Sequence, residues 1–183
     1  NIIDTLRNTK YFENTKPFVV HRLDKETSGV MIVAKNREYA QLFTSLFRIR
    51  KIHKTYLAIA HGQVNKDTNL LQDNLIIYEN NKKIVQKAIS YLKILNSNNK
   101  YSLLELKPIT GRKHQLRKQL YNIGNPVVGD DKYFIKIEKN KLKNKNLMLH
   151  AYKIKFMINN VKYNFEAKYD DHFNNFIKKN IKS

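Results

Sequence analysis

Alternating apolar and polar positions recur along this chain, and they predict a protein built mainly of β-strands. Such runs occupy residues 54–60, 75–78, 88–95, 101–106, 147–158 and 163–167. Gly62 closes the first run and Pro108 ends the fourth, as expected where strands stop. The apolar stretch from Val30 to Ala34 predicts a buried strand, and Val19-Val20 predicts the end of another.

Three segments have helical spacing instead, at residues 37–51, 112–123 and 171–183. Gly124 and Pro126 stop the second of them. Residues 8–16 and 65–74 are polar and predict loops, and residues 135–146, rich in lysine and asparagine, predict a solvated insertion. Strands outnumber helices and do not alternate with them regularly. We therefore expect an α+β fold with a large mixed, mostly antiparallel sheet flanked by helices and loops.

A length of 183 residues with 42% hydrophobic content suits one domain, spanning residues 1–183. No run approaches the ~18 apolar residues that a membrane span needs, and no signal peptide is visible, so we expect a cytoplasmic protein. Cysteine is absent, which excludes disulfides and thiol catalysis. The chain starts at Asn1 and not at Met, and we interpret it as a fragment with room upstream for a domain such as an S4-like RNA-binding domain.

The formal net charge of +20 indicates a polyanionic partner. Abundant Lys, Asn and Ile are also typical of an AT-rich genome, which accounts for part of the lysine excess. Arginine is scarce, so an arginine can mark a place that needs its planar, forked guanidinium. The seven arginines are Arg7, Arg22, Arg37, Arg48, Arg50, Arg112 and Arg117.

The most informative segment is the predicted loop His21-Arg22-Leu23-Asp24-Lys25-Glu26-Thr27-Ser28-Gly29. Asp24 lies between basic neighbours, and a carboxylate repels the anionic ligand that the rest of the surface attracts. It is therefore better suited to chemistry on that ligand than to binding it. The alternative is a turn aspartate that accepts hydrogen bonds from nearby backbone N–H groups. Gly29 is expected to supply a backbone angle that other residues resist.

Residues 21–35 resemble the signature segment of the RluA-type pseudouridine synthases. Three further stretches resemble motifs of that family in order and spacing, namely residues 54–62, 103–130 and 147–151. The resemblance extends from Val19 to Ala167, and within the family it is strongest to the large-subunit ribosomal RNA enzymes of the RluC and RluD kind. It implies the pseudouridine synthase fold.

The resemblance also implies a reaction, the isomerisation of a uridine within RNA. The N1–C1′ glycosidic bond breaks, the uracil rotates while held, and a C5–C1′ bond forms. Substrate and product are isomers, so we expect no cofactor and no metal.

The family pattern assigns roles to three residues. Asp24 is expected to be the essential catalytic carboxylate, either as a nucleophile or as a proton acceptor. Arg112 is expected to pair with Asp24 and to keep it ionised and aimed; the alternative is a phosphate clamp at a helix start. Tyr56 is expected to pack on the target uracil and to help remove the C5 proton, and the alternative is core packing.

Six more residues are expected to contact RNA, and they are His21, Arg22, Lys113, His114, Arg117 and Lys118. A target uridine must leave its stack before its sugar can be attacked. Arg22 would fill the vacated space or grip flanking phosphates. Lys113, Arg117 and Lys118 would contact backbone phosphates and make binding salt-dependent. For His21 and His114, hydrogen bonds that hold their loops are an alternative.

The sequence departs from the family pattern at two positions, where Gln119 and Asn125 each replace a more usual histidine. The partner predicted is ribosomal RNA of the large subunit, acted on by a monomer without a membrane. The alternatives are a transfer RNA or dual-specificity enzyme and a non-catalytic RNA-binding module on the same fold. A ribosomal structural protein would explain the charge but not the carboxylate at position 24.

Overall fold

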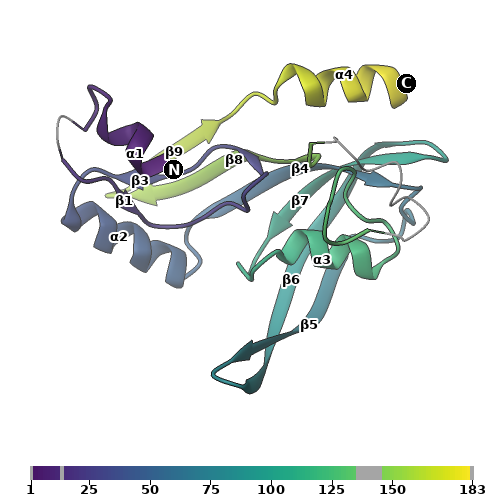
Figure 1. The fold of residues 1–183 in the computed structure, drawn as a ribbon, viewed down its shortest axis with the longest axis horizontal. Helices are drawn as coiled ribbons and strands as arrows, with labels where there is room; N and C mark the ends of the chain where they lie inside the picture. Colours follow the sequence, from purple (N-terminus) through teal and green to yellow (C-terminus); the bar gives the residue numbers. More distant parts are fainter. Residues whose placement is uncertain (1, 13–14, 135–145, 182–183) are drawn as a thin grey trace.

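The computed structural model describes residues 2–12, 15–134 and 146–181. Its centre is one large sheet with the strand order β2 (Ser28–Gly29), β8 (Leu149–Ile158), β4 (His53–His61), β7 (Tyr101–Pro108), β6 (Lys82–Ser97) and β5 (Leu70–Glu79). A further strand, β9 (Val161–Glu166), also pairs with β8. Among the strands that the structure describes, only β2 and β8 run parallel, and the other pairs are antiparallel. The expected α+β class with a mixed, mostly antiparallel sheet is confirmed (Figure 1).

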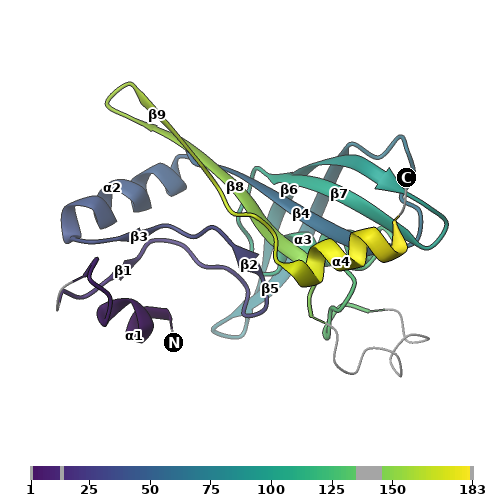
Figure 2. The same ribbon diagram turned by 90° about the horizontal axis from the view of Figure 1, so that it is seen from above.

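The helices described are α1 (Ile2–Arg7), α2 (Arg37–Arg48), α3 (Gln115–Asn122) and α4 (Asp171–Asn180). Helices α3 and α4 lie on opposite sides of the central strands (Figures 1 and 2). Leu116 and Leu120 of α3 and Phe173 of α4 all belong to the main core. The sheet is therefore covered on both faces where its strands are most apolar, and β4 is buried continuously from Tyr56 to Ala60.

A smaller apolar cluster holds α2 beside the far end of β8. Phe43 of α2 packs edge-on against Phe156, with ring centroids 5.2 Å apart. Beneath this helix runs a two-stranded ribbon of β1 (Phe18–Val19) and β3 (Val33–Ala34). The long loop between β1 and β2 leaves this ribbon and crosses to the main sheet, and it carries Asp24.

The predicted strand at residues 30–34 is wrong over most of its length, since only Val33–Ala34 is strand. The chain enters the main sheet earlier, at β2, where Gly29 has φ +112° and lies against the backbone of Ala151. Val30 then packs its side chain into the α2 cluster without joining a ladder. The apolar side chains of Val30 and Ile32 reflect burial against the α2 cluster, whereas Val33 and Ala34 pair with β1. The N–H of Val30 still donates to the Ala151 carbonyl at 2.9 Å.

Other boundaries also differ from the predictions. The strand β5 begins at Leu70, inside the predicted loop 65–74. It lies at the edge of the sheet and pairs only with β6 among the described strands, and an edge strand tolerates polar residues. Helix α3, predicted to start at Arg112, begins at Gln115, because His114 adopts a left-handed conformation with φ +53°. The predicted insertion at 135–146 lies almost wholly outside the described residues.

Candidate active site

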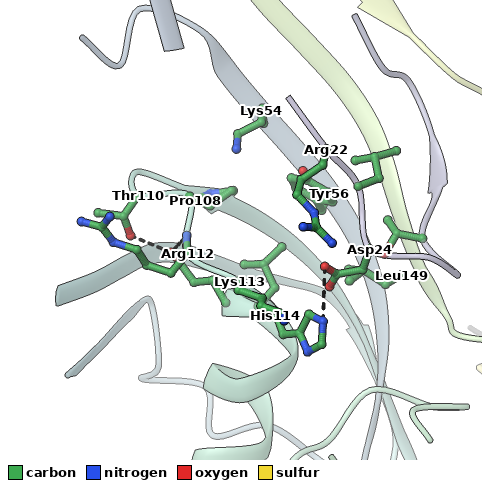
Figure 3. A pocket seen from close by; sticks show the side chains of 15 residues that line it. Arg22, Asp24, Lys54, Tyr56, Pro108, Thr110, Arg112, Lys113, His114 and Leu149 are labelled. Carbon is green, nitrogen blue, oxygen red and sulfur yellow. Dashed lines mark hydrogen bonds and ion pairs between the residues drawn. The ribbon is translucent and has the colours of Figure 1, made fainter. Parts of the chain in front are cut away.

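Asp24 stands in a tight turn between β1 and β2, closed by a hydrogen bond from Thr27 N–H to the Asp24 carbonyl at 2.9 Å. Its side chain is 17% exposed and points into a pocket on the α3 side of the sheet (Figure 3). The pocket has a volume of about 180 Å³. It is lined by Arg22, Leu23, Asp24, Thr27, Lys54, Tyr56, Pro108, Thr110, Gly111, Arg112, Lys113, His114, Gln115, Leu116 and Leu149.

Two basic side chains from the start of α3 face the Asp24 carboxylate. Nε2 of His114 lies 3.8 Å from one oxygen and a terminal nitrogen of Arg117 lies 3.8 Å from the other. The left-handed backbone at His114 turns its ring toward the loop, and its Nδ1 lies 3.0 Å from the Tyr133 hydroxyl. Burial lowers the pKa of His114 and Asp24 opposes that effect, so Arg117 is the permanent cation of this pair.

Arg117 is held in place by carboxylates on its other side. Its Nε and one terminal nitrogen donate to the two oxygens of Asp130 at 2.7 and 2.6 Å, and the same nitrogen reaches Asp131 at 3.1 Å. The hydrogen bond to Asp130 is the main reason that the pKa of Arg117 is raised. This bidentate geometry fixes the plane of the guanidinium. The remaining terminal nitrogen is thereby presented to Asp24.

The structure therefore brings Arg117 next to Asp24, where Arg112 was expected. Arg112 lines the pocket, but its Nε donates to the Lys87 carbonyl at 3.3 Å and its guanidinium points away from Asp24 (Figure 3). Arg117, expected to contact phosphate, is only 6% exposed and already surrounded by carboxylates. The physical reason is the late helix start, which places position 117, and not position 112, opposite the loop.

Tyr56 lies on β4 and forms another wall of the pocket. The pairing register of β4 with β8 shifts between Thr55 and Tyr56, a local irregularity of the kind that re-aims a side chain near functional sites. Burial, and secondarily the Asp24 charge, raise the pKa of Tyr56 to about 12. The phenol is therefore neutral at physiological pH, and it lies close enough to Asp24 for that charge to raise its pKa.

The remaining residues expected to contact RNA differ in their surroundings, and His21 has partners within the protein. His21 accepts a hydrogen bond from Ile32 N–H at Nε2 (2.8 Å) and lies 4.6 Å from the Phe47 ring. Burial, helped by Lys54, lowers the pKa of His21 to about 4, so it carries no charge for a phosphate at neutral pH. These contacts fit the loop-holding alternative for His21, and its contact with RNA stays a prediction.

Lys113 is exposed at the pocket wall and Lys118 is half-buried on α3 outside it. Arg22 is exposed and lines the pocket beside Asp24. Their contacts with RNA stay predictions.

The two departures from the family pattern have structural explanations. Gln119 is fully buried; its Oε1 accepts from the Ser90 hydroxyl at 2.7 Å, and its Nε2 donates to the carbonyls of Leu71 and Ala88. It therefore ties α3 to β5 and β6. Asn125 donates to the His61 carbonyl at 2.8 Å and closes the turn after α3.

Lys54 is a pocket residue that sequence reasoning missed as a functional group, although it stands two positions before Tyr56 in the same motif. Burial lowers the pKa of its amine. Its side chain has no hydrogen bond or ion pair to any described residue. The sequence feature that could have identified Lys54 is its position two residues before Tyr56 on β4. This spacing places both side chains on the face of the strand toward α3.

Comparison with known proteins decides the family. The family described as RNA pseudouridylate synthase matches residues 2–122. The chain belongs to this family. The resemblance to pseudouridine synthases is therefore confirmed.

Named members of the RNA pseudouridylate synthase family differ in their substrates. The chain is 36% identical over 149 residues to the ribosomal large subunit pseudouridine synthase D of Borreliella burgdorferi, covering 78% of this chain and 45% of that protein. It is 37% identical to the ribosomal large subunit pseudouridine synthase C of Rickettsia bellii, covering 85% of this chain and 55% of that one. It is 33% identical to the tRNA pseudouridine synthase C of Haemophilus ducreyi, covering 75% and 65%. The chain thus spans about half the length of the first two relatives.

Solved structures agree with the family. The human protein named RNA pseudouridylate synthase domain containing 4 superimposes with a TM-score of 0.79 at 25% identity, over 97% of this chain and 80% of that one. Among the described residues, no helix is long and apolar enough to cross a membrane. In the same part of the chain, no group of three or more His, Cys, Asp or Glu could hold a metal ion.

Proposed function

We propose that this chain is the catalytic domain of an RNA pseudouridine synthase and that Asp24 is its essential carboxylate. The observation that carries the proposal is the placement of one aimed carboxylate in a pocket whose other charged lining residues are basic and whose wall includes Tyr56. Arg117 and His114 face Asp24 from α3, and Tyr56 closes the pocket from β4. Membership of the RNA pseudouridylate synthase family supports the assignment.

The geometry suits a reaction in which the base is held while its bond to the sugar changes. Asp24 would meet the ribose or the base, as a nucleophile or as a proton acceptor, and Arg117 would keep its oxygens aimed. Tyr56 would lie against the uracil as a neutral phenol. The N1–C1′ bond breaks, the C5–C1′ bond forms, and the proton leaves C5 while N1 gains one, so atoms and electrons balance within the substrate and water.

The RNA we propose as substrate is that of the large ribosomal subunit. Two of the relatives named above are large-subunit enzymes, and both exceed in identity the transfer RNA enzyme. We also propose that one catalytic domain covers residues 1–183 and acts as a monomer. Mapping pseudouridines in ribosomal and transfer RNA from cells that lack this protein tests the substrate. Loss confined to transfer RNA would contradict it and favour the alternative substrate.

The decisive test of the activity is Asp24→Asn, with Glu26→Gln as the matched control. Glu26 is an exposed acid in the same loop, so the control removes an equal charge two residues away. We expect Asp24→Asn to reduce tritium release from C5-labelled uridine RNA by at least ~10²-fold while RNA binding changes little. The Glu26→Gln protein should turn over like wild type. Normal turnover by Asp24→Asn, or RNA binding without turnover by wild type, would defeat the proposal.

A further inference from the structure

A second hollow, of about 510 Å³, adjoins the candidate active site. We call it the basic groove. Its lining is Val20, His21, Arg22, Phe47, Arg48, Arg50, Ile52, Lys54, Pro108, Ile109, Thr110, Gly111 and Arg112. Arg22, Lys54 and Arg112 are among the residues that line both hollows, so the groove opens beside the pocket that holds Asp24.

The charges of the groove come from separate parts of the fold. Arg22 comes from the β1–β2 loop, Arg48 and Arg50 from the end of α2, Lys54 from β4, and Arg112 from the loop before α3. None of the described residues that line it is acidic. His21, the remaining titratable residue of the lining, is neutral above its pKa of about 4. The charged residues of the groove are therefore all cationic.

These cations are also unsatisfied by the protein. Among the described residues, the side chains of Arg22, Arg48 and Arg50 have no hydrogen bond or ion pair, and Arg112 has only the one to Lys87. Exposed arginines are individually unremarkable, since water solvates them. Four guanidiniums around one concave surface are different, because they repel one another and an anion that bridges them would relieve that repulsion.

Lys54 lines both hollows and adds an amine at their junction. Figure 3 shows its side chain in the pocket that holds Asp24. Lys54 stands close to the chain at Gly111, where an added Cβ would lie 3.7 Å from Nζ. Its burial without a partner disfavours the ammonium form, and the pKa is lowered. An anion at this junction would restore the charged form and offset that cost.

The backbone at Arg50 is a further indication. Arg50 follows α2 with φ +59°, a conformation that helix ends usually give to Gly or Asn. Backbone hydrogen bonds from Arg50 N–H to Phe47 and from Lys51 N–H to Leu46 fix this turn. An arginine here costs conformational energy that glycine would avoid. Its side chain has no partner within the described protein, so the protein itself does not repay that cost.

We propose that the basic groove binds backbone phosphates of the nucleotides next to the target uridine. The RNA strand would run along Arg48 and Arg50 and enter the catalytic pocket past Lys54 and Arg112. This inference rests on the proposed function, because it places the uridine in the pocket of Asp24. It assigns new RNA-binding roles to Arg48, Arg50 and Lys54.

The test uses the double variant Arg48→Gln/Arg50→Asn. Asparagine is chosen at position 50 because it tolerates the left-handed backbone. The matched control is Arg7→Gln/Arg37→Gln, which removes the same charge from two exposed arginines outside the groove. Arg48→Lys/Arg50→Lys serves as the rescue, since lysine still binds phosphate as a point charge. Equal thermal unfolding midpoints among the variants would show that each one folds.

The first readout is the KM for C5-tritiated large-subunit ribosomal RNA over a series of salt concentrations. We expect the double variant to raise KM and to flatten its salt dependence by about 0.7 in log–log slope per lost contact, with kcat within about twofold. The control and the lysine pair should keep the wild-type slope. A double variant with the slope and KM of the control, or one that loses kcat alone, would overturn the proposal.

The second readout needs no turnover. Binding of a short oligouridylate is compared with that of the same oligomer carrying uncharged methylphosphonate linkages. We expect wild type to prefer the charged oligomer and the double variant to lose part of that preference, as coupled groups do in a double-mutant cycle. An unchanged preference of the double variant for the charged oligomer would contradict phosphate binding in the basic groove. This outcome counts whether or not the wild type turns over its substrate. Failure of the proposed function is seen separately, as absent tritium release by a wild type that still binds the charged oligomer.

Discussion

Arg117 shows at the scale of one residue how the site is built, because a single guanidinium faces three carboxylates. Asp130 and Asp131 hold it on one side and Asp24 lies on the other. In the sequence, the family pattern favoured position 112 as the partner of Asp24, although both arginines lie in the same motif. Only the left-handed turn at His114 decides which of them faces the loop.

This arrangement predicts unequal effects of conservative changes at the two arginines. Arg117→Lys keeps the charge but loses the fork that bonds Asp130 and faces Asp24 together. Because misplacement of a catalytic group costs up to ~10²-fold, we expect kcat at saturating RNA to fall by roughly 10- to 100-fold. Arg112→Lys should keep kcat near wild type. Equal losses of kcat in the two variants would show that Arg117 is not the residue that positions Asp24.

His21 predicts a pH dependence of stability. Its pKa is about 4 in the folded protein and 6.5 as the ordinary value, so the unfolded chain binds the proton first as the pH falls. Stability is therefore full above about pH 6.5 and is lost as the pH falls toward 4. At about 1.4 kcal/mol per pKa unit, the loss reaches roughly 3 kcal/mol.

Urea unfolding of wild type and His21→Asn at several pH values measures this contribution. Asparagine offers an acceptor oxygen to Ile32 N–H but does not titrate, so the difference between the two proteins isolates the histidine. We expect that difference to shrink between pH 6.5 and 4. A constant difference would mean that His21 is not protonated on unfolding.

At the scale of elements, sequence patterns located nearly every strand but misjudged where several begin. The strand β5 starts in a polar run, and the α3 start depends on a backbone angle that no hydrophobic pattern reports. Gly29 is an exception, because its expected unusual angle, φ +112°, is present in β2. It matters because β2 ends the loop of Asp24.

Substitutions at two glycines test the pairing of β2 with β8. A Cβ at Gly29 would lie 2.2 Å from the Ala151 carbonyl oxygen, whereas one at Gly124 meets nothing within 4 Å; both residues have positive φ. We expect Gly124→Ala to cost about 1 kcal/mol of unfolding free energy from backbone strain alone. Gly29→Ala should cost at least ~3 kcal/mol, because the β2–β8 pairing must also open. Chemical denaturation measures both, and similar costs would show that the contact with Ala151 is unimportant.

At the scale of the whole molecule, the sequence predicted the fold class but not the order of the strands. Alternation indicates that β8 is a strand, yet nothing in residues 149–158 reveals that it lies between β2 and β4. Side-chain periodicity reports which face is buried and not which neighbour is paired. The Asp24 motif was recognisable because its residues are contiguous. The pairing of Asp130 with Arg117 and the grouping of Lys54 with the groove arginines arise only from tertiary structure.

The position of β8 has a consequence for synthesis on the ribosome. Two of its three partner strands, β2 and β4, emerge more than eighty residues earlier, and β8 bonds to each of them. Until its residues are translated, β4 has an empty flank and the segment holding Asp24 has no anchor at Gly29. The loop that is made early is therefore fixed late, and a nascent chain halted before Leu149 would contain every proposed catalytic residue without the strand that joins β2 to β4.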